Sequence, residues 1–417
     1  MREDYRKHFI LKHPRERFDD DFYNRYNVRT DLALEATEVI VEQGGPPEIP
    51  GVVVENQSTD YAKINRTTVE TDAGARAIGK VKGHYVTIES EALRDHNREV
   101  QKNVGQLIAE ELQKFLQDIA EDDPVLVVGL GNWNATPDAL GPRVIDKLLV
   151  TRHLFTMAPP ELRGGLRPVA ALAPGVLGIT GIETGETIQG VAEKVKPKLI
   201  ICIDALASRS TERLCTTIQI ADTGIHPGSG IGNVRMGITS QTMGVPVVAI
   251  GVPTVIHAVT LVSDGMEMIT NNGRQSAAVG VAPRVEQESG GGALQSSDSD
   301  ALHTSILDPS RIRFVPGTAD GGVDIEAAGE HSPLDEAVDA RMKRLGRQRA
   351  AQGAEGIDPA TKRRVLRQLL EPYLGTLVVT PKEIDVLIED AAWVVAAGLN
   401  TALHPGMDIE QAAQYTV

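Results

Sequence analysis

Apolar residues recur at helical spacing in two long segments of the chain. In residues 90–120 they fall three or four positions apart, which predicts a long amphipathic helix with Ser90 as its N-cap. Residues 380–403 predict a second helix, with Thr380 as the N-cap and Glu383 completing a capping box. Both helices have an apolar face long enough to cover part of a sheet.

Between the two helices, short apolar runs alternate with longer mixed segments. Four runs rich in β-branched residues cover 125–129, 168–172, 198–204 and 245–251, each bounded by Gly or Pro. Nearly continuous apolar strands separated by segments of crossover length are typical of a mostly parallel sheet with helices on both faces. Residues 52–88 instead alternate apolar and polar positions, so we expect an additional small β-rich subdomain there. The predicted fold class is α/β.

Composition and charge narrow the range of functions. The 417 residues carry a net charge of −15, which disfavours direct binding to nucleic acid or to an anionic membrane surface. The N-terminus lacks the apolar core of a secretion signal, and no apolar stretch is expected to span a bilayer. The two cysteines, Cys202 and Cys215, cannot build a disulfide framework and are expected to be reduced, buried thiols. These features predict a cytosolic protein.

A glycine-rich loop, GLGNWNATPDALGP at residues 129–142, directly follows the first apolar run. Gly129 and Gly131 match the start of a dinucleotide-binding fingerprint, but Asn134 occupies the third glycine position. A helix is expected to begin near Asp138, which places this side chain at the carboxyl edge of a strand. Asp138 could simply favour the helix N-terminus electrostatically, or it could be a functional carboxylate.

A second carboxylate, Asp204, is expected at the end of the strand 198–204. Adjacent strands lie about 4.8 Å apart, so acids leaving two neighbouring strands can face one water molecule. Two carboxylates that close share a proton, and the pair can then activate water and donate to a carbonyl oxygen. The alternative is that Asp204 only caps the next helix. The geometry permits amide hydrolysis without requiring it.

Several long motifs resemble one known family. The segments GLGNWNATPDALGP, LAPGVLGITGIETGE, IDALASRS and IQIADTGIHPGSGIGN, in this order, are similar to the germination proteases of spore-forming bacteria, as is LVVTPKEIDVLIEDAAWVVAAGLNTALH near the C-terminus. The resemblance covers roughly residues 24–270 and 356–417. It implies an endopeptidase of small acid-soluble spore proteins in the cytoplasm of the forespore or spore core. It further implies an atypical aspartic mechanism with Asp138 and Asp204, no cofactor, a homotetramer, and a fold similar to hydrogenase maturation peptidases.

The same resemblance implies a zymogen that processes itself. In NVRTDLALEA, the order Thr30, Asp31, Leu32, Ala33 matches the family's substrate sites, so cleavage is expected between Asp31 and Leu32. The alternative is an N-terminal strand or capping segment. The implied domains are a propeptide, a catalytic α/β domain, a flexible low-complexity insertion rich in Gly, Ser and Asp, and a helical part that packs on the catalytic domain. These cover residues 1–31, 32–270, 271–355 and 356–417.

Two other functions stay open on the sequence. Because hydrogenase maturation peptidases bind a metal ion, a metal-dependent processing peptidase is one alternative, with His226 or His257 as the better ligand candidates. The family resemblance leads us to expect Asp at position 257, which disfavours an essential role for His257. A non-catalytic nucleotide-binding regulator is the second alternative. For the endopeptidase, we expect Asn132, Thr136 and His226 to contact the substrate.

Overall fold

The computed structural model describes most of the chain outside the N-terminus and the long insertion. The described residues are 30–42, 44–157, 159, 161, 163–227, 235–258, 260–262 and 377–416. They belong to one compact unit formed by Met1–Glu267 and Ile357–Val417. The predicted insertion, 271–355, lies outside the described residues, as does nearly all of the predicted propeptide.

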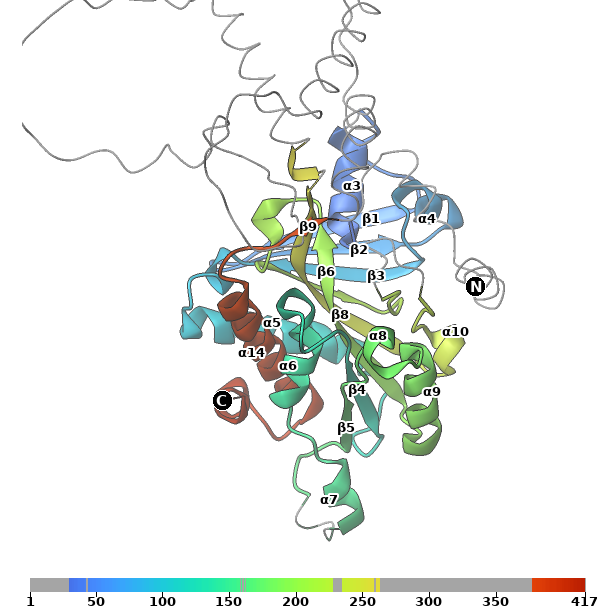
Figure 1. Ribbon diagram of the computed structural model, residues 1–417, viewed down its shortest axis with the longest axis vertical. Helices are drawn as coiled ribbons and strands as arrows, with labels where there is room; N and C mark the ends of the chain where they lie inside the picture. The colour runs from blue at the N-terminus through green and yellow to red at the C-terminus, as the bar shows by residue number, and fades with distance from the viewer. Residues whose placement is uncertain are drawn as a thin grey trace, which may run out of the picture. The chain divides into compact units, whose positions relative to one another are not determined.

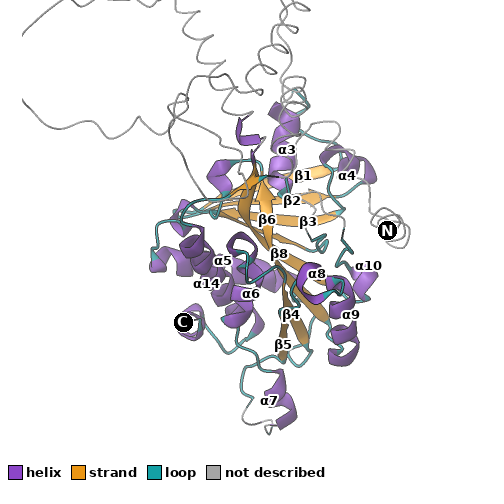
Figure 2. Cartoon of the chain, in the orientation of Figure 1, coloured by secondary structure: helices purple, strands orange, loops and turns teal. Residues whose placement is uncertain are grey.

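Nine strands of the described chain form a single mixed sheet, drawn in orange in Figure 2. Their order is β1-β2-β3-β7-β8-β6-β4-β5, and β9 pairs with β8 beyond this path. The strands are β1 (Val52–Ser58), β2 (Lys63–Val69), β3 (Gly83–Glu89), β4 (Val125–Gly129), β5 (Val169–Leu172), β6 (Leu199–Ser208), β7 (Thr217–Ala221), β8 (Val247–His257) and β9 (Val378–Val379). The four strands β5, β4, β6 and β8 run parallel, and all other pairs are antiparallel.

The predicted α/β class is confirmed, and its parallel part corresponds to the four apolar runs. The segment 52–88 is β-rich as expected, and its strands continue the same sheet through β7. The difference in pattern has a physical cause. All five residues of β4 are buried because helices cover both faces there, whereas every residue of β1 is at least partly exposed at the sheet edge.

Helices cover both faces of this sheet (Figure 1). They are α3 (Ala33–Glu42), α4 (Asp72–Ile78), α5 (Arg98–Phe115), α6 (Leu140–Asp146), α7 (Arg152–Met157), α8 (Leu177–Thr180), α9 (Thr184–Val195), α10 (Ser240–Met243), α14 (Ile384–Leu403) and α15 (Ile409–Tyr415). Helices α5, α6 and α14 pack on one face, which we call the core face. Helices α3, α4 and α9 pack on the opposite face, which we call the site face.

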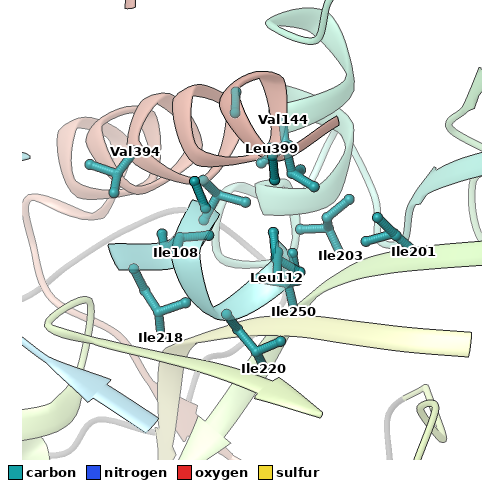
Figure 3. Packing of buried hydrophobic residues seen from close by; sticks show 14 of the residues in the cluster. Ile108, Leu112, Val144, Ile201, Ile203, Ile218, Ile220, Ile250, Val394 and Leu399 are labelled. Atoms are coloured by element: carbon teal, nitrogen blue, oxygen red, sulfur yellow. The ribbon is translucent and has the colours of Figure 1, made fainter. Parts of the chain in front are cut away.

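A continuous apolar cluster covers the core face from β2 to β5. A single cluster joins residues of seven strands to α5, α6 and α14, as Figure 3 shows for Ile108, Leu112, Val144, Ile201, Ile203, Ile218, Ile220, Ile250, Val394 and Leu399. Full burial of one such side chain contributes about 1.5–3 kcal/mol. Most of the hydrophobic stabilisation of the unit therefore lies on this face.

The site face is divided into two smaller apolar clusters. One joins α3 and α4 to the antiparallel strands, and the other joins α9 to the parallel strands. Residues between these clusters are buried but polar, and they alternate along their strands with residues of the core face. They are Thr87, Asp204, Thr217 and Gln219. A polar zone therefore lies in the middle of this face.

The first predicted helix begins later than the sequence suggested. Ser90 precedes a short 3-10 turn and makes no side-chain cap; its hydroxyl donates to the Tyr61 carbonyl instead. Helix α5 starts at Arg98, where the Asn97 side chain accepts from two backbone amides. His96 has a left-handed backbone, with φ of 53°, which interrupts the helical path between the two segments.

The second predicted helix also starts later. Thr380 does not cap α14, because its hydroxyl donates to the Thr254 carbonyl at 2.9 Å, and the N-cap residue is Glu383 without a side-chain cap. Contrary to expectation, α14 is long and apolar enough to cross a bilayer by composition. However, 89% of its apolar window is buried inside the protein, as for a core helix.

Candidate functional site

One pocket on the site face is lined by four of the residues singled out in the sequence. Its volume is about 330 Å³, and Asp31, Asp138, Asp204 and His226 are among the residues that line it. The remaining lining residues are Ala135, Pro137, Ala205, Leu206, Ala207, Ile225, Thr254, Val255 and Val378. The two predicted carboxylates thus line one pocket, together with a third carboxylate from the N-terminal segment.

The glycine-rich loop holds Asp138 in place through its backbone. Gly131 has φ of +113°, and a Cβ at this position would lie 2.0 Å from the Asp138 carbonyl oxygen. The next amide, that of Asn132, donates to the same oxygen at 2.8 Å. The Thr254 hydroxyl donates to the Pro137 carbonyl at 2.7 Å and ties the turn to β8. The loop thus uses this amide and the close approach of Gly131 for contacts within the protein. These contacts fix the backbone of Asp138.

Asp204 lies within β6 and not at its end, since the strand continues to Ser208. Asp204 is nevertheless the first residue of β6 beyond its pairing with β4. Strand β4 stops at Gly129, its pairing with β6 ends at Ile203, and Leu130 N–H donates to the Ile203 carbonyl at 2.8 Å. The β6 edge is therefore open from Asp204 onward, which lets the carboxylate face the pocket.

The two carboxylates have raised pKa values for related reasons. Burial raises the pKa of Asp138 to about 6, and a hydrogen bond from the Asn132 backbone opposes the rise. Asp204 is only 6% exposed, and burial raises its pKa well above the ordinary value; the charges of Asp138 and Asp31 raise it further. A backbone hydrogen bond from Ala205 acts in the opposite direction. Burial therefore disfavours the charged form of both acids, and the negative charges of Asp138 and Asp31 disfavour it further for Asp204.

The N-terminal segment occupies the open edge of β6. Asp31 N–H donates to the Ala207 carbonyl at 3.0 Å, and Ala207 N–H donates to the Asp31 carboxylate at 2.8 Å. On the other side, the Gln219 side chain contacts the backbone of Asp31 and Ala33. The segment is thus hydrogen-bonded to β6 at Ala207 and to β7 at Gln219.

Residues on both sides of Asp31 are also held. Lys80 Nζ donates to the Thr30 carbonyl at 2.8 Å, and Leu32 is fully buried. Glu35, 1% exposed, accepts from the Thr30 hydroxyl and from the Arg209 and Ser210 amides. Burial raises the pKa of Glu35, and these hydrogen bonds oppose the rise. The segment from Thr30 to Glu35 is thus bound along its length.

Not every predicted residue reaches the pocket. Asn132 and Thr136 support the turn before Asp138 and are not among the lining residues. His226 lines the pocket, and its contact with a substrate stays a prediction. His257 lies at the end of β8 opposite Val378 in β9, and it does not line the pocket.

The described residues were also expected to show any metal site formed around His226 or His257. They contain no group of three or more His, Cys, Asp or Glu side chains arranged to hold a metal ion. Both cysteines are buried free thiols, as predicted. Burial and the neighbouring charge of Asp204 raise the pKa of Cys202, so its thiol stays protonated.

Several residues around the pocket were not foreseen. Ala207, Gln219, Thr254 and Lys80 all contact the N-terminal segment or the Asp138 turn. No local motif marks them, because each acts through partners more than 45 positions away. Asp31 was expected as a cleavage-site residue, but its place in the same pocket as the other two acids follows only from the fold.

Comparison with known proteins identifies close relatives. Residues 33–280 and 339–416 match the family model for germination proteases. The chain is 41% identical over 399 residues to the germination protease of Geobacillus sp. (strain WCH70), covering 94% of this chain and 97% of that protein. It is 40% identical over 401 residues to the enzyme of Halalkalibacterium halodurans, covering 94% and 98%.

One solved structure shows a limited similarity. The [NiFe] hydrogenase maturation protease HycI from Thermococcus kodakarensis KOD1 is 19% identical, with 34% of this chain and 80% of that chain covered. The TM-score is 0.24, which is too low to support an argument from that protein.

Proposed function

The chain belongs to the germination protease family, and from this premise we propose that it is a self-processing endopeptidase that uses Asp138 and Asp204 to activate water. One observation carries the proposal: Asp138, Asp204 and the expected cleavage-site residue Asp31 line the same pocket. Burial raises the pKa of both acids, and the charges of Asp138 and Asp31 raise that of Asp204 further, which supports Asp138 as the base and Asp204 as the acid.

The reaction needs one water and one shared proton. Asp138 removes a proton from the water as its oxygen attacks the carbonyl carbon of residue 31, and Asp204 donates its proton to the carbonyl oxygen. The tetrahedral adduct then collapses. Asp138 passes its proton to the leaving nitrogen of Leu32, and a hydroxyl of the adduct returns a proton to Asp204. The products are a carboxyl group on Asp31 and an amine on Leu32, and both acids regain their starting state.

Self-cleavage between Asp31 and Leu32 is supported by how the segment is bound. Hydrogen bonds to Ala207 hold the residue before the bond, and Gln219 holds the residues on both sides. A bound segment of this kind also blocks the pocket to other peptides. Removal of residues 1–31 is therefore the step that frees the open edge of β6 for a substrate in trans.

The substrates are small acid-soluble spore proteins, which present the same order of residues as Thr30 to Ala33. This assignment rests on family membership, as do the homotetrameric assembly and the location in the spore core. The pocket is compatible with such substrates because Asp31, an acid before the scissile bond, already lies in it.

The test compares wild type with Asp138→Asn and Asp204→Asn. Intact mass measurement follows loss of the N-terminal 31 residues, and a peptide of the Thr-Glu-Ile-Ala type reports cleavage in trans. We expect each variant to lose at least about 100-fold in rate, a usual magnitude for a general acid or base. Wild-type cleavage rates in folded Asp138→Asn or Asp204→Asn would contradict the proposal.

The same assay separates the two alternatives. A metal-dependent peptidase, with His226 as a ligand, would lose activity on treatment with a chelator and regain it with added zinc or nickel. A nucleotide-binding regulator would bind nucleotide tightly, and Asp138→Asn would leave its function unchanged. No observation in the described residues favours either one over the aspartate pair.

A further inference from the structure

We propose that Gln219 is a further catalytic residue, which brackets the scissile peptide bond and stabilises the negative charge that develops on its carbonyl oxygen. The inference rests on the proposed function, because it takes the bond between Asp31 and Leu32 as the one that is cut. It adds a neutral hydrogen-bond donor to the two acids.

The amide of Gln219 contacts the peptide on both sides of that bond. Its Nε2 donates to the Asp31 carbonyl oxygen at 3.1 Å, and its Oε1 accepts from Ala33 N–H at 2.7 Å. The carbonyl belongs to the peptide bond that is cut, and the N–H belongs to the second residue after it. One side chain therefore fixes the orientation of the scissile peptide, as a neighbouring strand would.

The sheet register explains why Gln219 can reach this bond. Gln219 in β7 lies opposite Gly251 in β8, and Gly251 lies opposite Asp204 in β6. The three positions form one row across the site face, so Gln219 and Asp204 flank a glycine at a separation of about 9–10 Å. A Cβ at Gly251 would lie 2.4 Å from the Leu206 side chain, so the glycine lets Leu206 pack over the middle of this row.

Gln219 is held firmly in this orientation. Its neighbours in β7, Ile218 and Ile220, are fully buried on the core face, and strand alternation directs Gln219 to the site face. The side chain is only 8% exposed. A donor fixed in a water-poor site stabilises a developing oxyanion without reorganising during the reaction.

The donor and the acid have complementary roles. A carbonyl oxygen has two acceptor sites, so Nε2–H of Gln219 can occupy one while the proposed proton donor, Asp204, uses the other. The acceptor oxygen of the amide, Oε1, also makes the enzyme selective among substrates. It requires an N–H on the second residue after the cut, so a substrate with proline or an N-methylated residue there loses that hydrogen bond.

The experiment uses the full-length chain with Gln219→Met, Gln219→Glu and a matched control, Gln189→Met. Gln189 also donates from Nε2 to a backbone carbonyl, but its acceptor is Thr242 in α10, at 2.8 Å, and not the N-terminal segment. Self-cleavage is followed by mass spectrometry, and kcat and KM are measured in trans with the processed enzyme. Thermal unfolding checks the fold of each variant.

We expect Gln219→Met to slow self-cleavage about 100- to 1,000-fold, the usual effect of removing one oxyanion donor, while Gln189→Met cleaves at the wild-type rate. Gln219→Glu keeps the acceptor and loses the donor when ionised, so it should be similarly slow. In trans, the loss should fall mainly on kcat. Folded Gln219→Met that cleaves within threefold of wild type would overturn the proposal.

If Gln219→Met does not fold, the wild-type enzyme still provides a test. A peptide N-methylated at the position of Ala33 should lose at least about tenfold in kcat/KM compared with the unmethylated peptide. Equal kcat/KM values would overturn the proposal. Failure of the proposed function gives a different result, since wild type would then not cleave itself or Asp138→Asn would cleave normally.

Discussion

The two faces of the sheet differ in the residues that they bury. On the core face, a continuous apolar cluster joins the strands to α5, α6 and α14. On the site face, two separate apolar clusters leave a polar zone between them, where Asp204 and Gln219 lie. Because the side chains of a strand alternate between faces, each strand contributes to both. The sheet can thus carry buried acids on one side while the other side supplies the hydrophobic stabilisation.

The comparison predicts that substitutions on the two faces will have opposite consequences. Changes on the core face should lower the free energy of unfolding and leave the rate of each folded molecule unchanged. Changes in the polar zone of the site face should lower the rate, and some should raise the free energy of unfolding. Proteins commonly give up stability where a functional site requires buried polar groups.

The largest expected effect is on the core face. Ile250 is fully buried in the core-face cluster (Figure 3), and Ile250→Ala should lower the free energy of unfolding by about 2–5 kcal/mol. Denaturant unfolding measures the loss. The self-cleavage rate of the folded fraction should equal that of wild type, and a rate loss of more than about tenfold at full folding would break the proposed division between the faces.

The next effect concerns the glycine-rich loop that positions Asp138. Gly131→Ala introduces a Cβ beside the Asp138 carbonyl and forces alanine into a left-handed backbone, so we expect the self-cleavage rate to fall about 100-fold or more because the carboxylate moves. Gly190→Ala is the matched control. Position 190 lies on α9 with open space around its Cβ, so the change should be neutral or stabilise by about 0.5–1 kcal/mol. Equal self-cleavage rates in the two variants would show that Gly131 is not needed to position Asp138.

The smallest effect is a gain in stability. Above about pH 5 the unfolded chain releases the proton of Asp204, whereas the folded protein retains it because burial raises the pKa. Folding therefore takes up a proton, and this group lowers the stability as pH rises toward its folded pKa. We expect Asp204→Asn to raise the Tm by at least about 2 °C at pH 8 and by progressively less toward pH 4. Calorimetry at both pH values provides the measurement, and a Tm below wild type at pH 8 would contradict the assignment.

Much of the fold follows from local patterns in the sequence. The four apolar runs each became a parallel strand, because helices on both faces demand a continuous apolar sequence. Element boundaries were less predictable. The cap expected at Thr380 was lost to a contact with Thr254, 126 positions away, and a local rule cannot account for such a competitor.

The candidate site could also be predicted only in part from the sequence. Asp138 and Asp204 could be paired from the sequence because each follows an apolar run, and adjacent parallel strands bring such positions together. The row from Gln219 through Gly251 to Asp204 could not be predicted. It depends on the antiparallel register of β7 against β8, and neither strand contains a local signal for that register.

The central claim is that the carboxyl groups of Asp138 and Asp204 share one proton during catalysis. The pH dependence of wild-type self-cleavage tests this claim most directly. The first-order rate should be bell-shaped. It should fall below about pH 6 as Asp138 gains a proton, and fall again at higher pH as Asp204 loses its own. A rate that keeps rising into the alkaline range, in protein shown to be folded throughout, would contradict the account.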